Sequence, residues 1–477
     1  VRGRMSGGKK WIDKELLSVE TDEGKLSLFR LSLPIFLNMI SSLLISFVQT
    51  IAARRYMDGF LVVPITMAAT GFSFLQTVVM LIGTGAAILL SAYLGRKAYD
   101  DCKKIVGTSL ILSLIFALAV ALVGLAASGP LLKFMGMNKE EYAVYQPHAL
   151  AIFKWRMAEL VVWSVGNDAI SCLRCYGHTK IGFIAGLATN VVNIAGVVFS
   201  LFVLKIPAES AVLALSLISV ASSVVFTAIG LVFLRVKKIP AAARLDRTFT
   251  KKIFQVGVPA GISQIFYSLS QIVTTSICTR LPQAAYLAKT YLQQITQFVY
   301  KFGYSIGQAN AIIVGRLCGM GDPERADRIH RQDLKIVLLC NMALSVLCMI
   351  FGRSFLRLFF GADESILAFS LVFVIDIAVE FGRGMNHVGE NGLNATGDVR
   401  FTTICSIASC WVFSVGLSYL FVAVLGWSLY GMWIAFAVDE LFRGTAYLIR
   451  WKKQGWKKEF EKMMAGSARA RSDEQAE

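Results

Sequence analysis

Apolar residues run along most of this chain in stretches of about 20, separated by short polar segments that are rich in Lys and Arg. A stretch of about 20 apolar residues is long enough for a helix to cross a hydrocarbon core of about 30 Å. The stretches lack the alternation over about ten residues that the strands of a membrane barrel would show. The pattern therefore predicts an all-α polytopic membrane protein with 12 transmembrane helices. The expected spans are 29–53, 62–90, 105–127, 145–171, 181–204, 211–234, 252–279, 285–314, 333–352, 366–391, 401–424 and 428–449.

The net charge of +17 is informative only once the basic residues are located. If both termini are cytoplasmic, the cytoplasmic segments contain 33 Lys and Arg residues and the loops on the other side contain eight. This bias follows the positive-inside rule and predicts a multi-pass protein of the inner (plasma) membrane with both termini in the cytoplasm. The basic residues form no stripe interleaved with exposed aromatic residues, so the expected partner is the lipid bilayer and not a nucleic acid.

Composition narrows the chemistry further. Only 17% of the residues are charged, against roughly 25% in soluble proteins. Neither the nine cysteines nor the four histidines show the paired spacing of a metal site. No GxxxxGK[ST] motif for ATP is present. We therefore expect no cofactor, and no metal ion beyond a monovalent coupling cation (H⁺ or Na⁺) whose gradient supplies the energy.

The chain repeats itself at an offset of 220–225 residues. Pro34 at the start of the first span and Pro259 at the start of the seventh are one matched pair, and the turns at 176–180 and 396–400 are another. Such a repeat predicts two pseudo-symmetric six-helix bundles with a solute cavity between them. The expected parts are a cytoplasmic N-terminal segment at 1–28, an N-lobe at 29–234, a cytoplasmic linker at 235–251, a C-lobe at 252–450 and a basic cytoplasmic tail at 451–477.

Three of these features also resemble a known family. They are Pro34, the motif Cys172-Leu-Arg-Cys-Tyr-Gly-His-Thr-Lys180, and the motif Asn394-Ala-Thr-Gly-Asp-Val-Arg-Phe401. In this order they resemble the MATE (multidrug and toxic compound extrusion) transporters of the MOP flippase superfamily, over roughly 29–460. The resemblance implies a V-shaped pair of lobes in which entry of H⁺ or Na⁺ drives the export of organic cations, drugs or natural products.

The chain departs from the family pattern at the residues that couple cations. Many members have a carboxylate about 15 residues after the proline matched by Pro34, where this chain has Gln49. Asn193 matches a polar residue of the family, but the acid often found four residues later is absent. Tyr267 stands where many Na⁺-coupled members have a glutamate. The family's usual N-lobe proton switch is therefore not expected.

The tenth span has a stripe of ionisable residues, Asp376, Glu380, Arg383 and His387, on one helical face. Ionisable residues inside the membrane are costly and usually functional. The stripe is interpreted either as a C-lobe site for a cation or proton, or as a permanent ion pair that packs this helix against its neighbours.

The fourth span has a similar stripe with Arg156, Glu159 and Asn167. Through the repeat, Glu159 corresponds to within one residue of Glu380. Asp168 is the candidate replacement for the missing first-helix acid, because it could meet Asn193 and Gln49 inside the N-lobe. The alternative is that Asp168 pairs with a nearby basic residue.

The seventh and eighth spans are unusually polar, which predicts that they face the bundle interior or a wet cavity. Lys289 needs a carboxylate partner, for which we expect Asp376 or Glu380. The substrate-cavity candidates are Gln264, Tyr267, Lys289, Gln293, Gln297, Arg383, Asn167 and Arg156.

The favoured function is a cation-coupled antiporter that exports drug-like, organic-cation or secondary-metabolite molecules by alternating access between two lobes. We expect it to act as a monomer. A flippase for a lipid-linked precursor, from the same superfamily, is the second hypothesis. An intramembrane enzyme such as an acyltransferase is the third, and the spans contain no nucleophile–base pair that would support it.

Overall fold

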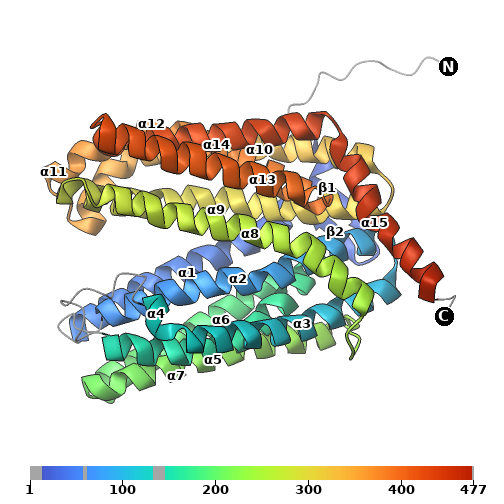
Figure 1. Ribbon diagram of the computed structural model, residues 1–477, viewed down its shortest axis with the longest axis horizontal. Coiled ribbons are helices and arrows are strands. Elements are labelled where there is room, and N and C mark those ends of the chain that lie inside the picture. Colours follow the sequence, from blue (N-terminus) through green and yellow to red (C-terminus); the bar gives the residue numbers. More distant parts are fainter. Residues whose placement is uncertain (1–12, 57–61, 133–145, 475–477) are drawn as a thin grey trace.

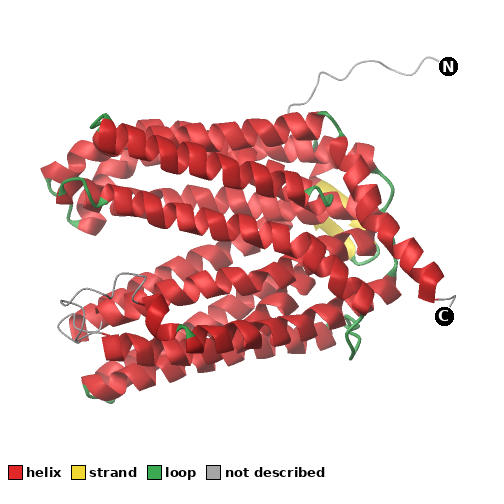
Figure 2. Cartoon of the chain, in the orientation of Figure 1, coloured by secondary structure: helices red, strands yellow, loops and turns green. Residues whose placement is uncertain are grey.

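The computed structural model describes residues 13–56, 62–132 and 146–474, and nearly all of them are helical (Figure 2). Within this part of the chain, each of the 12 predicted spans coincides with a helix. They are α1 (Leu28–Tyr56), α2 (Val62–Gly95), α3 (Tyr99–Ala126), α5 (Gln146–Cys175), α6 (Thr179–Val198), α7 (Ala208–Val236), α8 (Arg247–Cys278), α9 (Gln283–Gly319), α10 (Pro323–Phe360), α12 (Val372–Ala395), α13 (Val399–Ser409) and α14 (Ser428–Lys452). Shorter or peripheral elements are β1 (Ser18–Thr21), β2 (Gly24–Ser27), α4 (Ser128–Leu132), α11 (Glu364–Leu367) and α15 (Gly455–Glu474). π-helical turns extend α6 over Phe199–Val203 and α13 over Cys410–Leu417 and Tyr419–Val424.

Hydropathy located the membrane segments better than the helix ends. α10 was expected over 333–352 but extends from Pro323 to Phe360. Asp322 caps its start by accepting a hydrogen bond from the backbone N–H of Arg325 at 3.0 Å, and Gly361 ends it with a φ of 60°. The capping residues set the ends of the helix, whereas the thickness of the membrane sets the length of the apolar run. The helix is therefore longer than the run.

In the described residues, seven helices are long and apolar enough to cross a membrane by length and composition alone. They are α2, α3, α6, α7, α10, α12 and α13, in whole or in part. α5, α8, α9 and α14 are as long but more polar. These four helices, together with α12, carry most of the candidate site.

The helices form two bundles, an N-lobe of α1–α7 and a C-lobe of α8–α14 (Figure 1). α5 lies at the centre of the N-lobe, against α2, α3 and α7, and α12 occupies the matching place against α9, α10 and α14. The two lobes converge at the end that carries β1, β2 and α15, and diverge towards α11 (Figure 1). The fold is therefore that of an all-α polytopic membrane protein with 12 transmembrane helices in two pseudo-symmetric bundles.

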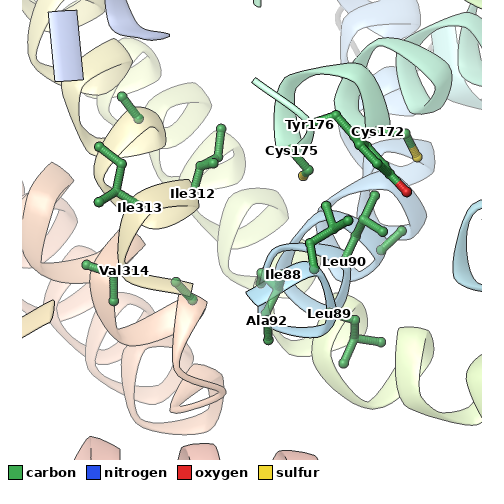
Figure 3. Close-up of a cluster of buried hydrophobic side chains, with 14 of the residues drawn as sticks. Ile88, Leu89, Leu90, Ala92, Cys172, Cys175, Tyr176, Ile312, Ile313 and Val314 are labelled. Atoms are coloured by element: carbon green, nitrogen blue, oxygen red, sulfur yellow. The ribbon is translucent and has the colours of Figure 1, made fainter. Parts of the chain in front are cut away.

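At the convergent end, α2 of the N-lobe contacts α8 and α9 of the C-lobe through glycines. A Cβ atom added to Gly95 would lie only 2.9 Å from the Cα of Gly319, so any larger residue would push the lobes apart. One buried apolar cluster spans both lobes here, and Figure 3 shows part of it, with Ile88 from α2 and Ile312 from α9. Two other apolar clusters each stay within one lobe.

The repeat is visible in the backbone of two matched turns. Gly177 joins α5 to α6 with a φ of +83°, and Gly397 joins α12 to α13 with a φ of +82°. Residues with a side chain rarely adopt this conformation, which accounts for the glycine in both copies of the motif.

A hairpin of β1 and β2 ties the two lobes together at the convergent end. Asp22, in its turn, accepts hydrogen bonds from Lys97 Nζ at 2.9 Å and from the Tyr99 hydroxyl at 3.0 Å, both in the N-lobe. The adjacent Glu23 forms an ion pair of 3.0 Å with Arg316 of α9, in the C-lobe. Hydropathy gave no indication of this hairpin, because it lies outside the apolar runs.

The segment between α7 and α8 lies against the N-lobe. The backbone N–H of Ala242 donates to the carbonyl oxygen of Lys103 on α3 at 3.0 Å. Asp246 then caps α8 by accepting a hydrogen bond from the backbone N–H of Phe249 at 3.0 Å. The chain is therefore held to α3 before it enters the second bundle.

Candidate functional site

A network of charged side chains joins α12 to α14 inside the C-lobe. Arg383 Nη1 donates to Glu380 Oε1 at 2.5 Å, and Arg383 Nε donates to Glu440 Oε1 at 3.4 Å. Asn386 Nδ2 donates to the other oxygen of Glu440 at 2.7 Å. Glu380 and Glu440 are both buried, so their charges are balanced by these neighbours rather than by water.

The network continues along α14. Arg443 Nη2 lies 3.0 Å from a carboxylate oxygen of Asp439 and 3.0 Å from one of Glu440. The Ser409 hydroxyl also donates to Asp439, at 2.6 Å. With Glu380 included, three carboxylates share two guanidinium groups, which makes this part of the C-lobe more acidic than basic.

Asp376 lies one turn before Glu380 on α12 and is equally buried. Trp433 Nε1 on α14 donates to its Oδ1 atom at 2.9 Å. Within the described part of the chain, Asp376 Oδ2 and Glu380 Oε2 have no hydrogen-bond partner. A buried carboxylate oxygen without a partner costs free energy, which a proton or a small cation would recover.

A cavity with about 350 Å³ of empty volume borders this network inside the C-lobe. It contains two of the predicted substrate-cavity residues, Gln264 and Tyr267. Arg443 lies over the ring of Tyr267, with its Cζ atom 5.7 Å from the ring centre. The cavity is lined by Gln264, Tyr267, Tyr300, Tyr304, Asn386, His387, Glu390, Ser406, Glu440 and Arg443.

A larger cavity, with about 830 Å³ of empty volume including its open mouth, lies between the lobes. α2 and α5 form one side and α9 and α12 form the other, so the repeat supplies matching walls. Tyr304 lines both cavities, and the predicted Asn167 lines this one. The polar residues of its lining are Thr84, Ser91, Asn167, Ser171, Arg174, Tyr304, Gln308, Asn391 and Asn394.

The N-lobe carries a simpler ion pair on α5. Arg156 Nη1 lies 2.7 Å from Glu159 Oε2, and the Ser223 hydroxyl of α7 donates to Glu159 Oε1 at 3.3 Å. The Arg156 guanidinium also lies over the Phe72 ring, 5.1 Å from its centre. One acid and one base neutralise each other, with a serine as the polar neighbour.

The structure does not join Asp168 to Asn193. Asp168 is buried beside Ser109 and Ser113 of α3. Asn193 Nδ2 instead donates to the Ser222 hydroxyl of α7 at 3.4 Å. The expected meeting of these two side chains is therefore wrong, because α5 turns Asp168 towards α3 while α6 turns Asn193 towards α7.

The expected partner of Lys289 was also wrong. Lys289 Nζ donates to the Thr275 hydroxyl of α8 at 2.6 Å, and not to Asp376 or Glu380. α8 and α9 are consecutive antiparallel helices, so Thr275 lies across the short turn between them. The two acids of α12 bind Trp433 and Arg383 instead.

The remaining predicted residues lie outside the two cavities. Gln293 and Gln297 are half-buried on α9 and line neither of them. Arg383 and Arg156 are used in the ion pairs described above. Gln49 belongs to the part of α1 whose side chains the structure does not describe.

Sequence reasoning gave no role to the acids and the arginine of α14, Asp439, Glu440 and Arg443, or to Glu390 on α12. A signal was present, because three ionisable residues occur within the last predicted span. The sequence did not show that these side chains would contact residues of the tenth span. Only the packing of α12 on α14 shows the network.

The described residues contain no group of three His, Cys, Asp or Glu side chains placed to hold a metal ion. Two arginines already neutralise most of the charge of the carboxylates that they contact on α12 and α14.

Known proteins resemble the chain over most of its length. The MatE family model matches residues 34–199 and 259–420, one stretch in each lobe. YisQ of Bacillus subtilis, described as an uncharacterized transporter, is 28% identical over 90% of this chain and 94% of its own length. YoeA of the same species, a probable multidrug resistance protein, is 24% identical over 78% of this chain and 82% of its own length.

Solved structures share the fold at low sequence identity. A MOP superfamily transporter from Pyrococcus furiosus has a TM-score of 0.80 and 19% identity, over 90% of this chain and 96% of that one. A crystal structure of a MATE protein in a bent conformation has a TM-score of 0.79 and 20% identity, over 91% of this chain and 96% of that one.

Proposed function

Because the chain belongs to the MatE family of membrane transporters, we propose that it is an antiporter in which the entry of H⁺ or Na⁺ drives the export of drug-like or secondary-metabolite molecules. The chain is a transporter rather than an enzyme. The name of YoeA, a probable multidrug resistance protein, supports a drug-like substrate.

One observation carries the proposal of cation coupling: the pair of buried carboxylates on α12. Asp376 and Glu380 each keep one oxygen without a partner, one helical turn apart. Two negative charges this close repel each other, so binding of one proton or one Na⁺ stabilises the pair. We assign this pair as the coupling site.

The position of α12 connects this site to a change in lobe arrangement. α12 packs against α14, α9 and α10, and α9 in turn contacts α1 and α2 of the other lobe. Neutralising Glu380 would release Arg383 to Glu440 and shift α12 against α9. A cation that binds one arrangement more tightly moves the equilibrium between the two, which is the requirement for coupling.

The positive-inside rule orients the protein in the membrane. The chain is a multi-pass membrane protein, and we propose that both termini, and with them the convergent end, lie in the cytoplasm. In this orientation the lobes diverge towards the outside. We further propose that a single chain is the functional unit, since each bundle contributes one wall of the inter-lobe cavity.

Purified protein in liposomes tests the coupling. An inward pH gradient or Na⁺ gradient is imposed, and the efflux of fluorescent dyes of both charges is recorded. We expect a gradient to stimulate wild-type efflux several-fold and Glu380→Gln to abolish the stimulation, while exchange without a gradient persists. Glu159→Gln is the matched control, since Glu159 occupies the corresponding place in the N-lobe. Equal loss in both variants, or in neither, would contradict a coupling site on α12.

A further inference from the structure

Most basic side chains within the lobes have a partner that accounts for them. Arg156 pairs with Glu159 in the N-lobe, and Arg383 and Arg443 pair with the acids of the C-lobe. These arginines therefore hold the bundles together and are not available to a transported molecule.

Arg174 differs from these arginines. It lies in the last turn of α5 and lines the inter-lobe cavity. Its Nε atom is buried without a hydrogen-bond partner, and within the described residues its guanidinium group forms no ion pair. Arg174 as a whole is half-buried, and a positive charge held there without a counter-ion is costly, so an anion from outside the chain would compensate it.

The walls around Arg174 suit an anion. No Asp or Glu is among the described lining residues of this cavity; the carboxylate of Asp168 packs against Gly83 of its wall. The polar groups of the lining residues are amides and hydroxyls, with Asn167 on one side of Arg174 and Gln308, Asn391 and Asn394 on the opposite walls. Amide N–H groups donate to anions without adding charge, and the guanidinium fork matches a carboxylate, sulfonate or phosphate in geometry.

A second positive charge lies on α9, the helix that forms the opposite wall from Arg174. Lys301 precedes Tyr304 by three residues and Gln308 by seven on α9, so all three share one helical face. Lys301 is half-buried and has no acidic partner among the described residues. Lys301 is not among the lining residues of the cavity, but it adds a positive charge about one helical turn from Tyr304, which does line it.

The C-lobe cavity has the opposite character, since Glu390 and Glu440 line it beside Arg443. Tyr304 borders both cavities and lies within electrostatic reach of Arg174 on one side and of Glu390 on the other. The molecule thus separates an acidic region, suited to a cation, from a region around Arg174 that has no acidic lining residue in the described part of the chain.

We propose that the inter-lobe cavity binds the transported molecule through an anionic group, a carboxylate, sulfonate or phosphate, held by Arg174. The proposal rests on the transport function given above and specifies its substrate class as organic anions or zwitterions.

Two dyes with one xanthene frame and opposite charge test the proposal. Fluorescein is the anionic probe and rhodamine 6G the cationic one, and binding to the purified full-length chain in detergent is followed by fluorescence anisotropy without any gradient. We expect Arg174→Gln to weaken fluorescein binding roughly tenfold or more, because a charge-assisted hydrogen bond is lost. Arg174→Lys keeps the positive charge but loses the planar guanidinium group, so its affinity for fluorescein should lie between those of the wild type and Arg174→Gln. The binding of rhodamine 6G should not weaken in either variant.

Arg280→Gln is the matched control, because Arg280 is exposed at the far end of α8. It should bind fluorescein like the wild type. Variants are compared only if they elute as the wild type does in size exclusion and keep its melting temperature. If Arg174→Gln fails this criterion, the proposal is tested with Arg174→Lys and Lys301→Gln instead. Both of these variants must then weaken fluorescein binding.

Phosphatidylglycerol added as a competitor distinguishes two sources of the anion. Competition with fluorescein indicates an acidic lipid headgroup, as a flippase would bind, and lack of competition indicates a soluble organic anion; both support an anion site. Fluorescein binding that is absent in the wild type, or unchanged in Arg174→Gln, overturns the proposal. Neither result bears on coupling, which fails separately if Glu380→Gln keeps its response to a gradient.

Discussion

The central helices of the two lobes carry the same pair of charges in different surroundings. α5 has Arg156 beside Glu159, and α12 has Glu380 beside Arg383. In the N-lobe the neighbouring helix α7 meets this pair with a serine, Ser223, and the charges end there. In the C-lobe α14 meets it with Glu440, and the charges continue into a network. The repeat thus preserved helix positions while the chemistry of the two lobes diverged.

This difference supports the proposal that coupling belongs to the C-lobe. A closed pair of opposite charges is already neutral and gains little from a proton or a cation. A network with more carboxylates than guanidinium groups, such as that of α12 and α14, can change its protonation and rearrange its bonds. Four tests break or sharpen this comparison, beginning with the largest expected effect.

Removing the acid that joins the C-lobe network should destabilise the protein most. Glu440→Gln leaves Arg383 and Arg443 buried with one carboxylate fewer, and breaking such a buried network costs about 3–5 kcal/mol. Glu159→Gln should cost less, since the Arg156 guanidinium also lies over Phe72. Thermal unfolding in detergent, followed by tryptophan fluorescence, measures both. Equal losses would show that the two lobes use their charges alike.

Double-mutant cycles compare the two ion pairs directly. The interaction energy of Arg383 with Glu440 should be roughly 2 kcal/mol, and that of Arg156 with Glu159 roughly 1 kcal/mol or less. The reason is that Glu440 also bonds to Arg443 and Asn386, whereas Glu159 has only the Ser223 hydroxyl as a further polar partner. Unfolding of the single and double alanine variants gives both values. A larger energy in the N-lobe would contradict the comparison.

The hydrogen bond from Trp433 to Asp376 should have a measurable effect of its own. Trp433→Phe removes the indole N–H and leaves both oxygens of Asp376 without a partner, at a cost of about 1–3 kcal/mol beyond the lost ring volume. Trp163→Phe is the control in the N-lobe, because no described hydrogen bond uses its indole N–H. The melting temperature should fall further in Trp433→Phe than in Trp163→Phe, and the difference measures the contribution of the hydrogen bond. Equal decreases would mean that this bond does not stabilise the protein.

The matched turns should respond alike. Gly177→Ala and Gly397→Ala each force a side chain into a positive φ, which costs roughly 1–2 kcal/mol. A Cβ at Gly177 would meet the end of the Leu26 side chain, and one at Gly397 would meet the Met463 side chain, both of which are flexible. Similar decreases in melting temperature are expected, and effects that differ severalfold would contradict equivalent turns.

Contacts within one helix of the site could be predicted from the sequence, whereas contacts between helices could not. The pairs at spacing three, such as Glu380 with Arg383, could be read from helical periodicity because both partners lie on one helix. The partner of Lys289 could not, since several polar helices offered acceptors and only packing selects Thr275. Arg174 belongs to the motif at 172–180, but nothing in the sequence placed it in a cavity between the lobes.

The amino-acid sequence by itself determined the 12 spans, their division into two repeats and the turn glycines, because hydrophobic length and local backbone conformation depend on neighbouring residues. Only the tertiary structure decided which charges on different helices meet. The packing of α12 on α14 produces an acidic network. The packing of α2 and α5 against α9 and α12 produces a cavity with no carboxylate among its described lining residues, and a hairpin joins the two lobes at one end. The physical reason is that ion pairs and cavities between helices depend on the rotation and position of each helix, which hydropathy does not encode.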